Sequence, residues 1–205
     1  MLHLTLVRHA STAWNEAGRY QGWGDPPLSP RGRAEALALG PALAAEAFDR
    51  VVASDLARTA ETARIALPSA EIEADPRLRE MHFGAWEGLT WNECVARDGR
   101  LVHRWVSDPA AHAPPDGETL AAFEARIAEA LAELPSAGRI LWVVHAGVIH
   151  SVLARWMGIE IGRTFALRLS PCGITRAEIH PDGVRILGVN EGGGQAVVPA
   201  PAAEA

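Results

Sequence analysis

The sequence contains few cysteines. Its 205 residues include two, Cys94 and Cys172, which lie far apart and show no spacing typical of metal ligands. A disulfide framework or a zinc site is therefore not expected, and both side chains are predicted to be ordinary reduced thiols.

Long hydrophobic runs are also missing. No stretch reaches the roughly 18 apolar residues that suggest a transmembrane helix, and no basic segment followed by a long apolar one marks a signal peptide. The formal net charge of −6 argues against a general surface for nucleic acid or for anionic membranes. We therefore expect a cytoplasmic protein that binds neither, while a local cationic pocket is still compatible with an acidic chain.

The apolar residues that are present alternate between strand-like and helix-like patterns. Strands are predicted over residues 4–7, 50–53, 71–74, 140–144, 173–180 and 183–189, and the main helices begin at Ser29-Pro30 and cover 55–66, 120–134 and 148–157. Such alternation predicts an α/β fold with a mostly parallel sheet covered by helices on both faces. We expect a single domain over residues 1–190 and a flexible tail over 191–205. An irregular excursion over about 77–117 is expected to lie above the sheet.

Cationic side chains follow three of the predicted strands. Arg8 and His9 end the first strand, Arg58 lies in the first turn of the helix after the second, and His145 follows the strand at 140–144. Alone, Arg8-His9 is equally compatible with a solvated strand end. Because the carboxyl ends of parallel strands share one edge of a sheet, we expect the four side chains to converge there.

Two arginines and two histidines without nearby aspartates make a poor metal site but a good site for a dianionic phosphoryl group. Guanidinium groups present planar forks of donors that match phosphate oxygens. Ala146 and Gly147 open a predicted helix, so their backbone N–H groups are also expected to face an anion.

Four stretches resemble the signatures of the histidine phosphatase superfamily, in its phosphoglycerate-mutase-like branch. They are LVRHASTAWN, SDLARTAETA, REMHFGAWEG and VVHAGVI, they occur in the order of that family, and together the likeness covers residues 2–189. The resemblance implies a three-layer α/β/α sandwich, a phosphoglycerate-mutase-like fold. It also implies an enzyme that forms a phosphohistidine intermediate and uses neither a metal nor another cofactor.

The resemblance assigns roles to particular residues. His9 is expected to be the nucleophile and Glu80 the general acid and then the general base, while Arg8, Arg58 and His145 surround the phosphoryl group. Asn15 matches a phosphate-contacting position, and Gln21 and Gly22 match the stretch that lines the substrate entrance.

The chemistry of these residues adds expectations about protons. The attacking nitrogen of His9 must be unprotonated, so its other ring nitrogen should donate to a nearby carbonyl. Cationic neighbours should keep His9 neutral, since like charges disfavour the imidazolium form. During phosphoryl transfer, a protonated His145 is expected to join Arg8 and Arg58 in stabilising charge on the equatorial oxygens.

The sequence favours a phosphatase over a mutase. Mutases of this family carry a longer insertion with paired arginines, whereas Arg97, Arg100 and Arg104 here are single and spaced. The stretches around Glu80 and at 108–119 look most like α-ribazole-5′-phosphate phosphatases of cobalamin assembly, so the expected partner is a small phosphorylated metabolite. The alternatives are a broad-specificity phosphatase, a phosphoglycerate mutase, and an inactive phosphate-binding regulatory protein. Whether the chain forms a homodimer stays open.

Tryptophans lie near the predicted entrance and in the excursion. Trp23, Trp86 and Trp91 are candidates for an aromatic wall of the substrate pocket. The alternative is that they are simply core, as aromatic residues more often are. His82 is a candidate to face the substrate, and a packed position is expected for His150.

Overall fold

The computed structural model describes residues 1–192. Six strands form one mixed sheet in the order β3-β2-β4-β1-β5-β6. Their bounds are β1 Leu2–Arg8, β2 Arg50–Ala53, β3 Ile72–Ala74, β4 Gly138–Val144, β5 Ile174–His180 and β6 Gly183–Glu191. β1 to β4 run parallel to one another, and β5 and β6 are antiparallel additions at the β1 side. The predicted α/β class and mostly parallel sheet are confirmed.

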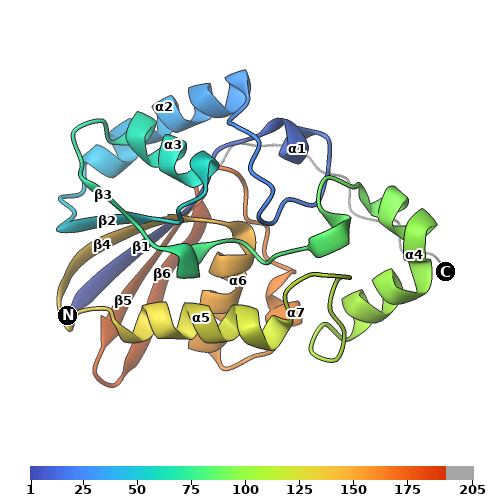
Figure 1. Cartoon of the computed structure of the whole chain (residues 1–205). Helices are drawn as coiled ribbons and strands as arrows, with labels where there is room; N and C mark the ends of the chain where they lie inside the picture. Colours follow the sequence, from blue (N-terminus) through green and yellow to red (C-terminus); the bar gives the residue numbers. More distant parts are fainter. Residues whose placement is uncertain (193–205) are drawn as a thin grey trace.

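Helices cover both faces of this sheet. They are α1 Ala13–Glu16, α2 Pro30–Ala44, α3 Ala57–Ala66, α4 Trp91–Ser107, α5 Leu120–Ala132, α6 Ala146–Met157 and α7 Ile161–Thr164. In Figure 1, α2 and α3 lie on one face, and α5 and α6 lie on the other. The three layers therefore agree with the sandwich that the sequence predicted.

Side-chain alternation along the central strands builds the two halves of the core. In β4, Ile140, Trp142 and Val144 belong to the cluster that includes α5 and α6, whereas Leu141 and Val143 belong to the cluster that includes α2 and α3. Successive residues of a strand point to opposite faces, so a nearly continuous apolar run fits a strand that is buried on both sides.

Helix starts follow the local sequence in most places. Ser29 Oγ accepts the N–H of Gly32 at 3.0 Å, with Pro30 in the first turn of α2. The helix after β2 begins later than residue 55, where the sequence predicted its start. α3 begins only at Ala57, with Leu56 at the N-cap position and no capping bond from that residue's own side chain.

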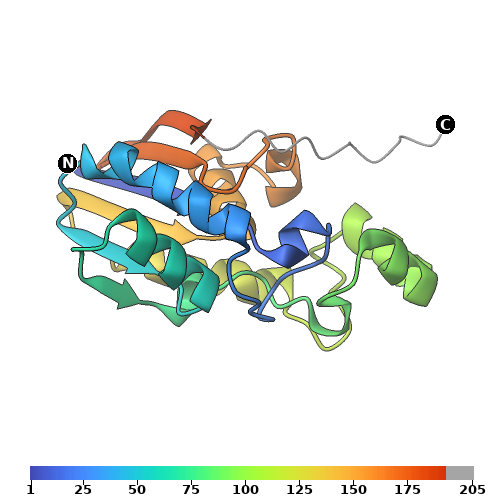
Figure 2. The ribbon, with the colours of Figure 1, turned by 90° about the horizontal axis from the view of Figure 1, so that it is seen from above.

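The excursion lies beyond the carboxyl ends of the parallel strands, at the opposite end of the sheet from the N-terminus (Figure 2). Its main helix, α4, is interrupted at Asp98, whose φ of −153° and ψ of 72° are not helical. Trp86, Cys94 and Val102 form a small buried core of the excursion. Trp86 is therefore packed inside and does not wall a pocket.

Two further expectations concern the C-terminal tail and the lack of membrane-spanning helices. β6 reaches Glu191, the first residue of the predicted tail, and Gly192 follows it in a turn. Residues 193–205 of that tail lie outside the described part of the chain. Within residues 1–192, no helix is both long enough and apolar enough to span a membrane.

Candidate active site

The two site histidines become neighbours through the pairing of β1 with β4. Arg8 pairs with Val144 in the parallel register, so the next residue of each strand, His9 and His145, emerges at the same edge. Their ring centroids are 5.1 Å apart at an interplanar angle of 61°, and both rings are buried. The backbone N–H of His9 also donates to the carbonyl of Val144 at 2.9 Å.

One ring nitrogen of His9 is occupied. Nδ1 lies 2.8 Å from the backbone oxygen of Ala10, and because a carbonyl can only accept, Nδ1 carries the hydrogen and Nε2 keeps its lone pair. Burial lowers the pKa of His9 well below its usual value, and the nearby Arg58 and Arg8 guanidinium groups lower it further. The expected neutral imidazole with a donor to a carbonyl is confirmed.

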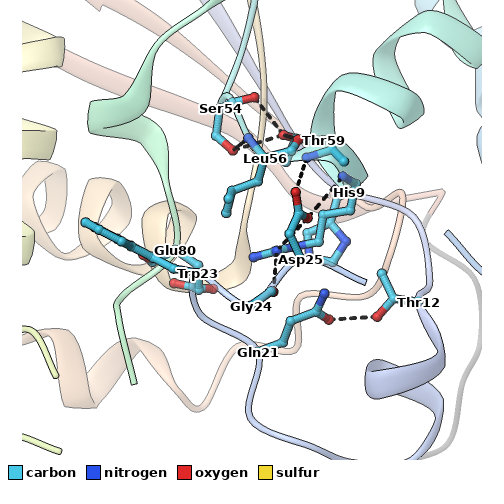
Figure 3. A network of polar contacts seen from close by, with 12 residues as sticks. His9, Thr12, Gln21, Trp23, Gly24, Asp25, Ser54, Leu56, Thr59 and Glu80 are labelled. Atoms are coloured by element: carbon cyan, nitrogen blue, oxygen red, sulfur yellow. Dashed lines mark hydrogen bonds and ion pairs between the residues drawn. The ribbon is translucent and has the colours of Figure 1, made fainter. Parts of the chain in front are cut away.

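His145 is held in the opposite tautomer. Its Nδ1 accepts from Nη2 of Arg58 at 3.1 Å, so its Nε2–H donates to Ser54 Oγ at 2.8 Å. The Ser54 hydroxyl in turn lies 2.9 Å from Thr59 Oγ1, which donates to the carbonyl of Leu56 at 2.7 Å. Ser54, Thr59 and Leu56 form the upper part of the network in Figure 3.

The protonation state of His145 depends on whether the site is occupied. Burial, followed by the charge of Arg58, lowers the pKa of His145 well below its usual value. The free site therefore holds a neutral His145, with an arginine donor on its Nδ1. The imidazolium form expected during phosphoryl transfer stays a prediction.

Arg58 is a fully buried guanidinium at the start of α3. Its Nη2 donates to the carbonyl of Gly22 at 2.7 Å, and its Nη1 donates to the carbonyl of Gly24 and to Asp25 Oδ1, both at 3.2 Å. Burial lowers the pKa of Arg58, opposed by the charges of nearby carboxylates. The loop over 21–25 thus holds Arg58 against the histidines, and the predicted place of Gly22 at the substrate entrance stays a prediction.

Three buried donors around these groups have no acceptor among the described residues. They are Nε of Arg8, Nε of Arg58 and Nε2 of Gln21. Arg8 is otherwise anchored through Nη1 to the carbonyl of Leu169 at 2.6 Å, and Gln21 through Oε1 to the hydroxyl of Thr12 at 2.7 Å (Figure 3). Because buried polar groups are normally bonded, these donors indicate a site for a ligand rich in acceptor oxygens, such as a phosphoryl group.

Glu80 closes the site from the side of the excursion. Its Oε2 accepts the N–H of Gly147 at 3.0 Å, and its Oε1 accepts the N–H of Met81 at 2.9 Å. A Cβ at position 147 would lie 2.1 Å from Oε1 of Glu80, so this contact requires glycine. The N–H of Gly147 was expected to face an anion, but Glu80 occupies it, and Ala146 at the first position of α6 is left for that role.

Asn15 is the predicted residue whose role the contacts leave open. Its Oδ1 accepts the N–H of Thr12 at 3.1 Å, and its backbone N–H donates to Thr12 Oγ1 at 3.2 Å, which completes a capping box at the start of α1. Its contact with phosphate stays a prediction.

Sequence reasoning missed two carboxylates that shape the entrance loop. Asp25 accepts the N–H of Ala57 and caps α3 from a distance, which is why Leu56 needs no capping side chain. Glu87 accepts the N–H groups of Trp23 and Gly24 and so ties the loop to the excursion. Glu87 stands inside the third signature, so its position was the available signal; Asp25 in GWGDPP reads only as a turn residue.

A cavity of about 350 Å³ opens beside Glu80 and Gly147. Its walls are almost entirely apolar and include Phe83, Trp105, Leu120, Phe123, Ile161 and Phe165. An ester oxygen leaving the phosphoryl group would depart on the Glu80 side, so this cavity can receive the alcohol part of a substrate.

The remaining aromatic and histidine candidates are now placed. Trp23 is partly exposed, donates through Nε1 to the carbonyl of Glu80 at 3.0 Å, and lies 4.9 Å from the ring of His82. His150 packs at 5.1 Å against Phe165, as expected for a packed histidine, and also lines the cavity. Trp91 contacts His103 on α4.

Comparisons with known proteins agree with this geometry. Residues 4–192 match the family described as the histidine phosphatase superfamily (branch 1). A protein of Serratia proteamaculans named "Probable phosphoglycerate mutase GpmB" is 31% identical over 183 residues, which are 87% of this chain and 85% of that protein.

Solved structures are similar over nearly the whole chain. The α-ribazole phosphatase from Shigella flexneri superposes with a TM-score of 0.84 at 28% identity and covers 96% of this chain and 100% of its own. A phosphoserine phosphatase from Entamoeba histolytica, solved in complex with 3-phosphoglyceric acid, superposes with a TM-score of 0.83 at 25% identity and covers 93% and 98%.

Proposed function

The chain belongs to the histidine phosphatase superfamily, branch 1, and is a phosphatase; we propose that it hydrolyses phosphomonoesters through a phosphohistidine at His9. The observation that carries this proposal is the state of His9. Its Nδ1–H is committed to the carbonyl of Ala10, and burial beside Arg8 and Arg58 keeps the pKa of the ring low. Nε2 is therefore an unprotonated nucleophile at neutral pH.

In the first step, the lone pair of His9 Nε2 attacks phosphorus. The bond from phosphorus to the ester oxygen breaks, the oxygen keeps the bonding pair, and Glu80 gives it a proton. In the second step, Glu80 takes a proton from water while the water oxygen attacks phosphorus. The bond to nitrogen breaks, its electron pair returns to Nε2, and inorganic phosphate leaves.

The buried donors supply the stabilisation of charge. The free Nε–H groups of Arg8 and Arg58 and the amide of Gln21 are suited to the equatorial oxygens of the transferring group, where charge must be stabilised. A dianionic phosphoryl group beside His145 favours its imidazolium form, so the third cation expected from the sequence forms on binding. No step in this scheme needs a metal ion.

The proposed substrate is α-ribazole 5′-phosphate. Support comes from the likeness to the Shigella flexneri α-ribazole phosphatase and from the aromatic cavity beside Glu80, which suits a heteroaromatic base. Relatives named for phosphoglycerate mutase and phosphoserine phosphatase make 3-phosphoglycerate and phosphoserine the competing substrates. A broad-specificity phosphatase is the remaining alternative.

Labelling tests the chemistry. A phosphate-labelled substrate should give an acid-labile, base-stable phosphoenzyme in the wild type and in His180→Ala, a control in the distant β5–β6 hairpin, but none in His9→Ala. Hydrolysis should be unchanged in the presence of a chelator. If the wild type neither hydrolyses nor becomes labelled, the chain is a phosphate-binding regulatory protein instead.

A substrate panel tests the specificity. Purified enzyme should hydrolyse α-ribazole 5′-phosphate with a higher kcat/KM than 3-phosphoglycerate, phosphoserine or sugar phosphates. Equal and slow hydrolysis of the whole panel would remove the α-ribazole assignment and leave the phosphatase assignment intact.

A further inference from the structure

The cavity beside Glu80 is lined by almost no charged side chains. Among the residues that line it, Glu80 is the one formally charged side chain, and no arginine contributes to its walls. Burial holds the pKa of His150, its second titratable residue, at about 4, so His150 adds no positive charge at neutral pH. The cations of the site, Arg8 and Arg58, do not line this cavity.

Building on the proposed function, we infer that this cavity selects phosphomonoesters whose alcohol part is apolar and uncharged, and rejects esters that carry a second anionic group. A carboxylate placed here would lose water and gain no cationic partner among the lining residues. An apolar chain or ring would instead replace water against Phe123, Leu120 and Ile161.

The rim of the cavity is also apolar. Val106 on α4 and Phe165 after α7 line it and are 56% and 59% exposed. Large apolar side chains on the surface beside a cavity are typical of a binding surface for an apolar ligand. The rim also offers a position where one added charge should change selectivity without touching the catalytic groups.

A matched pair of substrates tests this selection. Butyl phosphate and 4-phosphooxybutanoate share a leaving chain and differ in one terminal carboxylate. We expect kcat/KM to favour butyl phosphate by about 30-fold or more, as a buried charge without a partner requires. Val106→Arg should raise kcat/KM for the carboxylated ester by about tenfold through a charge-assisted contact, with little effect on butyl phosphate.

Leu187→Arg is the matched control, since Leu187 is similarly exposed but lies on the edge strand β6. This substitution should leave kcat/KM unchanged for both butyl phosphate and 4-phosphooxybutanoate. If the wild type hydrolysed the two esters equally well, or the carboxylated one faster, the proposed selection would be overturned. Phosphoenzyme formation in the same experiment would still support the phosphatase function. Failure to hydrolyse either ester and to form a phosphoenzyme would instead count against the proposed function.

A separate observation concerns how Glu80 is held. Arg126, on α5, donates through Nη1 to the carbonyls of Arg77 and Arg79, both at 2.6 Å, and through Nη2 to the carbonyl of Glu80 at 2.9 Å. Its Nε and Nη2 also bind the two oxygens of Glu118 at 2.8 and 2.9 Å. The rigid fork of one guanidinium therefore fixes the backbone on which Glu80 stands.

Glu118 extends the same clamp past Glu80. Its Oε2 also accepts the N–H of His82 at 3.3 Å, so the segment is held on both sides of the carboxylate. We propose that Arg126 is a positioning residue for proton delivery by Glu80. It acts through the backbone, since none of its contacts involves the Glu80 carboxyl group.

The dependence on the leaving group separates positioning from general stability. A nitrophenolate leaves without a proton, whereas an alkoxide needs one, and general acid catalysis contributes on the order of 10²-fold or more. Arg126→Lys should therefore lower kcat/KM for butyl phosphate by about 100-fold and for p-nitrophenyl phosphate by less than about threefold.

Arg50→Lys is the matched control because it breaks a similar two-bond pair, with Glu73, at an exposed site between β2 and the edge strand β3. This control should leave kcat/KM unchanged for both butyl phosphate and p-nitrophenyl phosphate. Glu118→Gln keeps the shape of the clamp and weakens its charge, so it should show a smaller loss with the same selectivity and also serves if Arg126→Lys folds poorly. Equal losses for both substrates in the two clamp variants would refute the positioning role.

Discussion

Ser54→Ala is the perturbation whose outcome follows most directly from the geometry. The Ser54 hydroxyl accepts the Nε2–H of His145 at 2.8 Å and passes its own hydrogen on to Thr59 at 2.9 Å. All three side chains are buried. Removing one oxygen creates almost no space but leaves the Nε2–H without an acceptor, while Arg58 still occupies the other nitrogen.

The size of the effect can be worked out from this loss. Leaving a buried donor unsatisfied costs about 1–3 kcal/mol, and for a chain of this size about 2 kcal/mol corresponds to a Tm lowered by roughly 4–8 °C. If the loss also loosens the ring of His145 in the transition state, kcat/KM should fall by about 10- to 100-fold, equivalent to roughly 1.4–2.7 kcal/mol.

Two measurements check the reasoning. Thermal unfolding gives the stability loss, and ¹⁵N chemical shifts of His145 should report a hydrogen on Nε2 in the wild type and a mixed or altered state in Ser54→Ala. Ser136→Ala is the control, since Ser136 is exposed in the loop before β4. A Tm and a kcat/KM unchanged from wild type in Ser54→Ala would show that Ser54 does not fix the tautomer.

Three further predictions follow from other contacts. His9, His145 and His150 all have lowered pKa values in the folded state, that of His150 at about 4. Below pH about 6.5 the unfolded chain therefore binds more protons than the folded chain. The free energy of unfolding should consequently fall as the pH drops from 7 to 4, by up to about 1.4 kcal/mol per pH unit for each histidine. Urea unfolding across that range should show this slope, and His150→Phe should reduce it; a pH-independent midpoint would contradict the buried neutral histidines. Glu87→Gln removes an acceptor for backbone N–H groups of the entrance loop. KM should therefore rise by about tenfold, the equivalent of about 1.4 kcal/mol, with kcat less affected. Steady-state kinetics with butyl phosphate measure both constants, and a fall in kcat alone would show that Glu87 acts in the chemical step instead. Gly84→Ala should lower stability by about 2 kcal/mol or more, because φ is +53° and a Cβ would lie 2.0 Å from a carbonyl oxygen; a Tm equal to wild type would refute it.

The site residues at the ends of the parallel strands could be predicted from local patterns in the sequence. An apolar run followed by a polar residue marks the carboxyl end of a buried strand, and parallel strands bring those ends to one edge. His9, Arg58 and His145 were placed correctly for that reason. Ser54 also directly follows a predicted strand, at 50–53, and lies at the same edge.

Residues that join distant segments were out of reach. Arg126 meets the backbone near Glu80 across more than 40 positions, and Glu87 meets the loop at 22–24 across more than 60. On a helix or in a turn, each is an ordinary charged residue, and nothing in the periodicity distinguishes it from a solvated one. Pairing of this kind depends on how α5 and the excursion pack, which no short stretch determines.

The sequence by itself determined the α/β class, the order of the strands along the chain and the group of side chains delivered to one sheet edge, since these depend on local patterns of apolar and polar residues. Only the tertiary structure decided the states of those side chains. His145 is neutral because burial and the donor from Arg58 act on it together, and His9 is a free nucleophile because the carbonyl of Ala10 takes its other nitrogen. Desolvation and the direction of a hydrogen bond are properties of a packed three-dimensional environment, so the chemistry of LVRHASTAWN was completed only when β1, β4 and α3 came together.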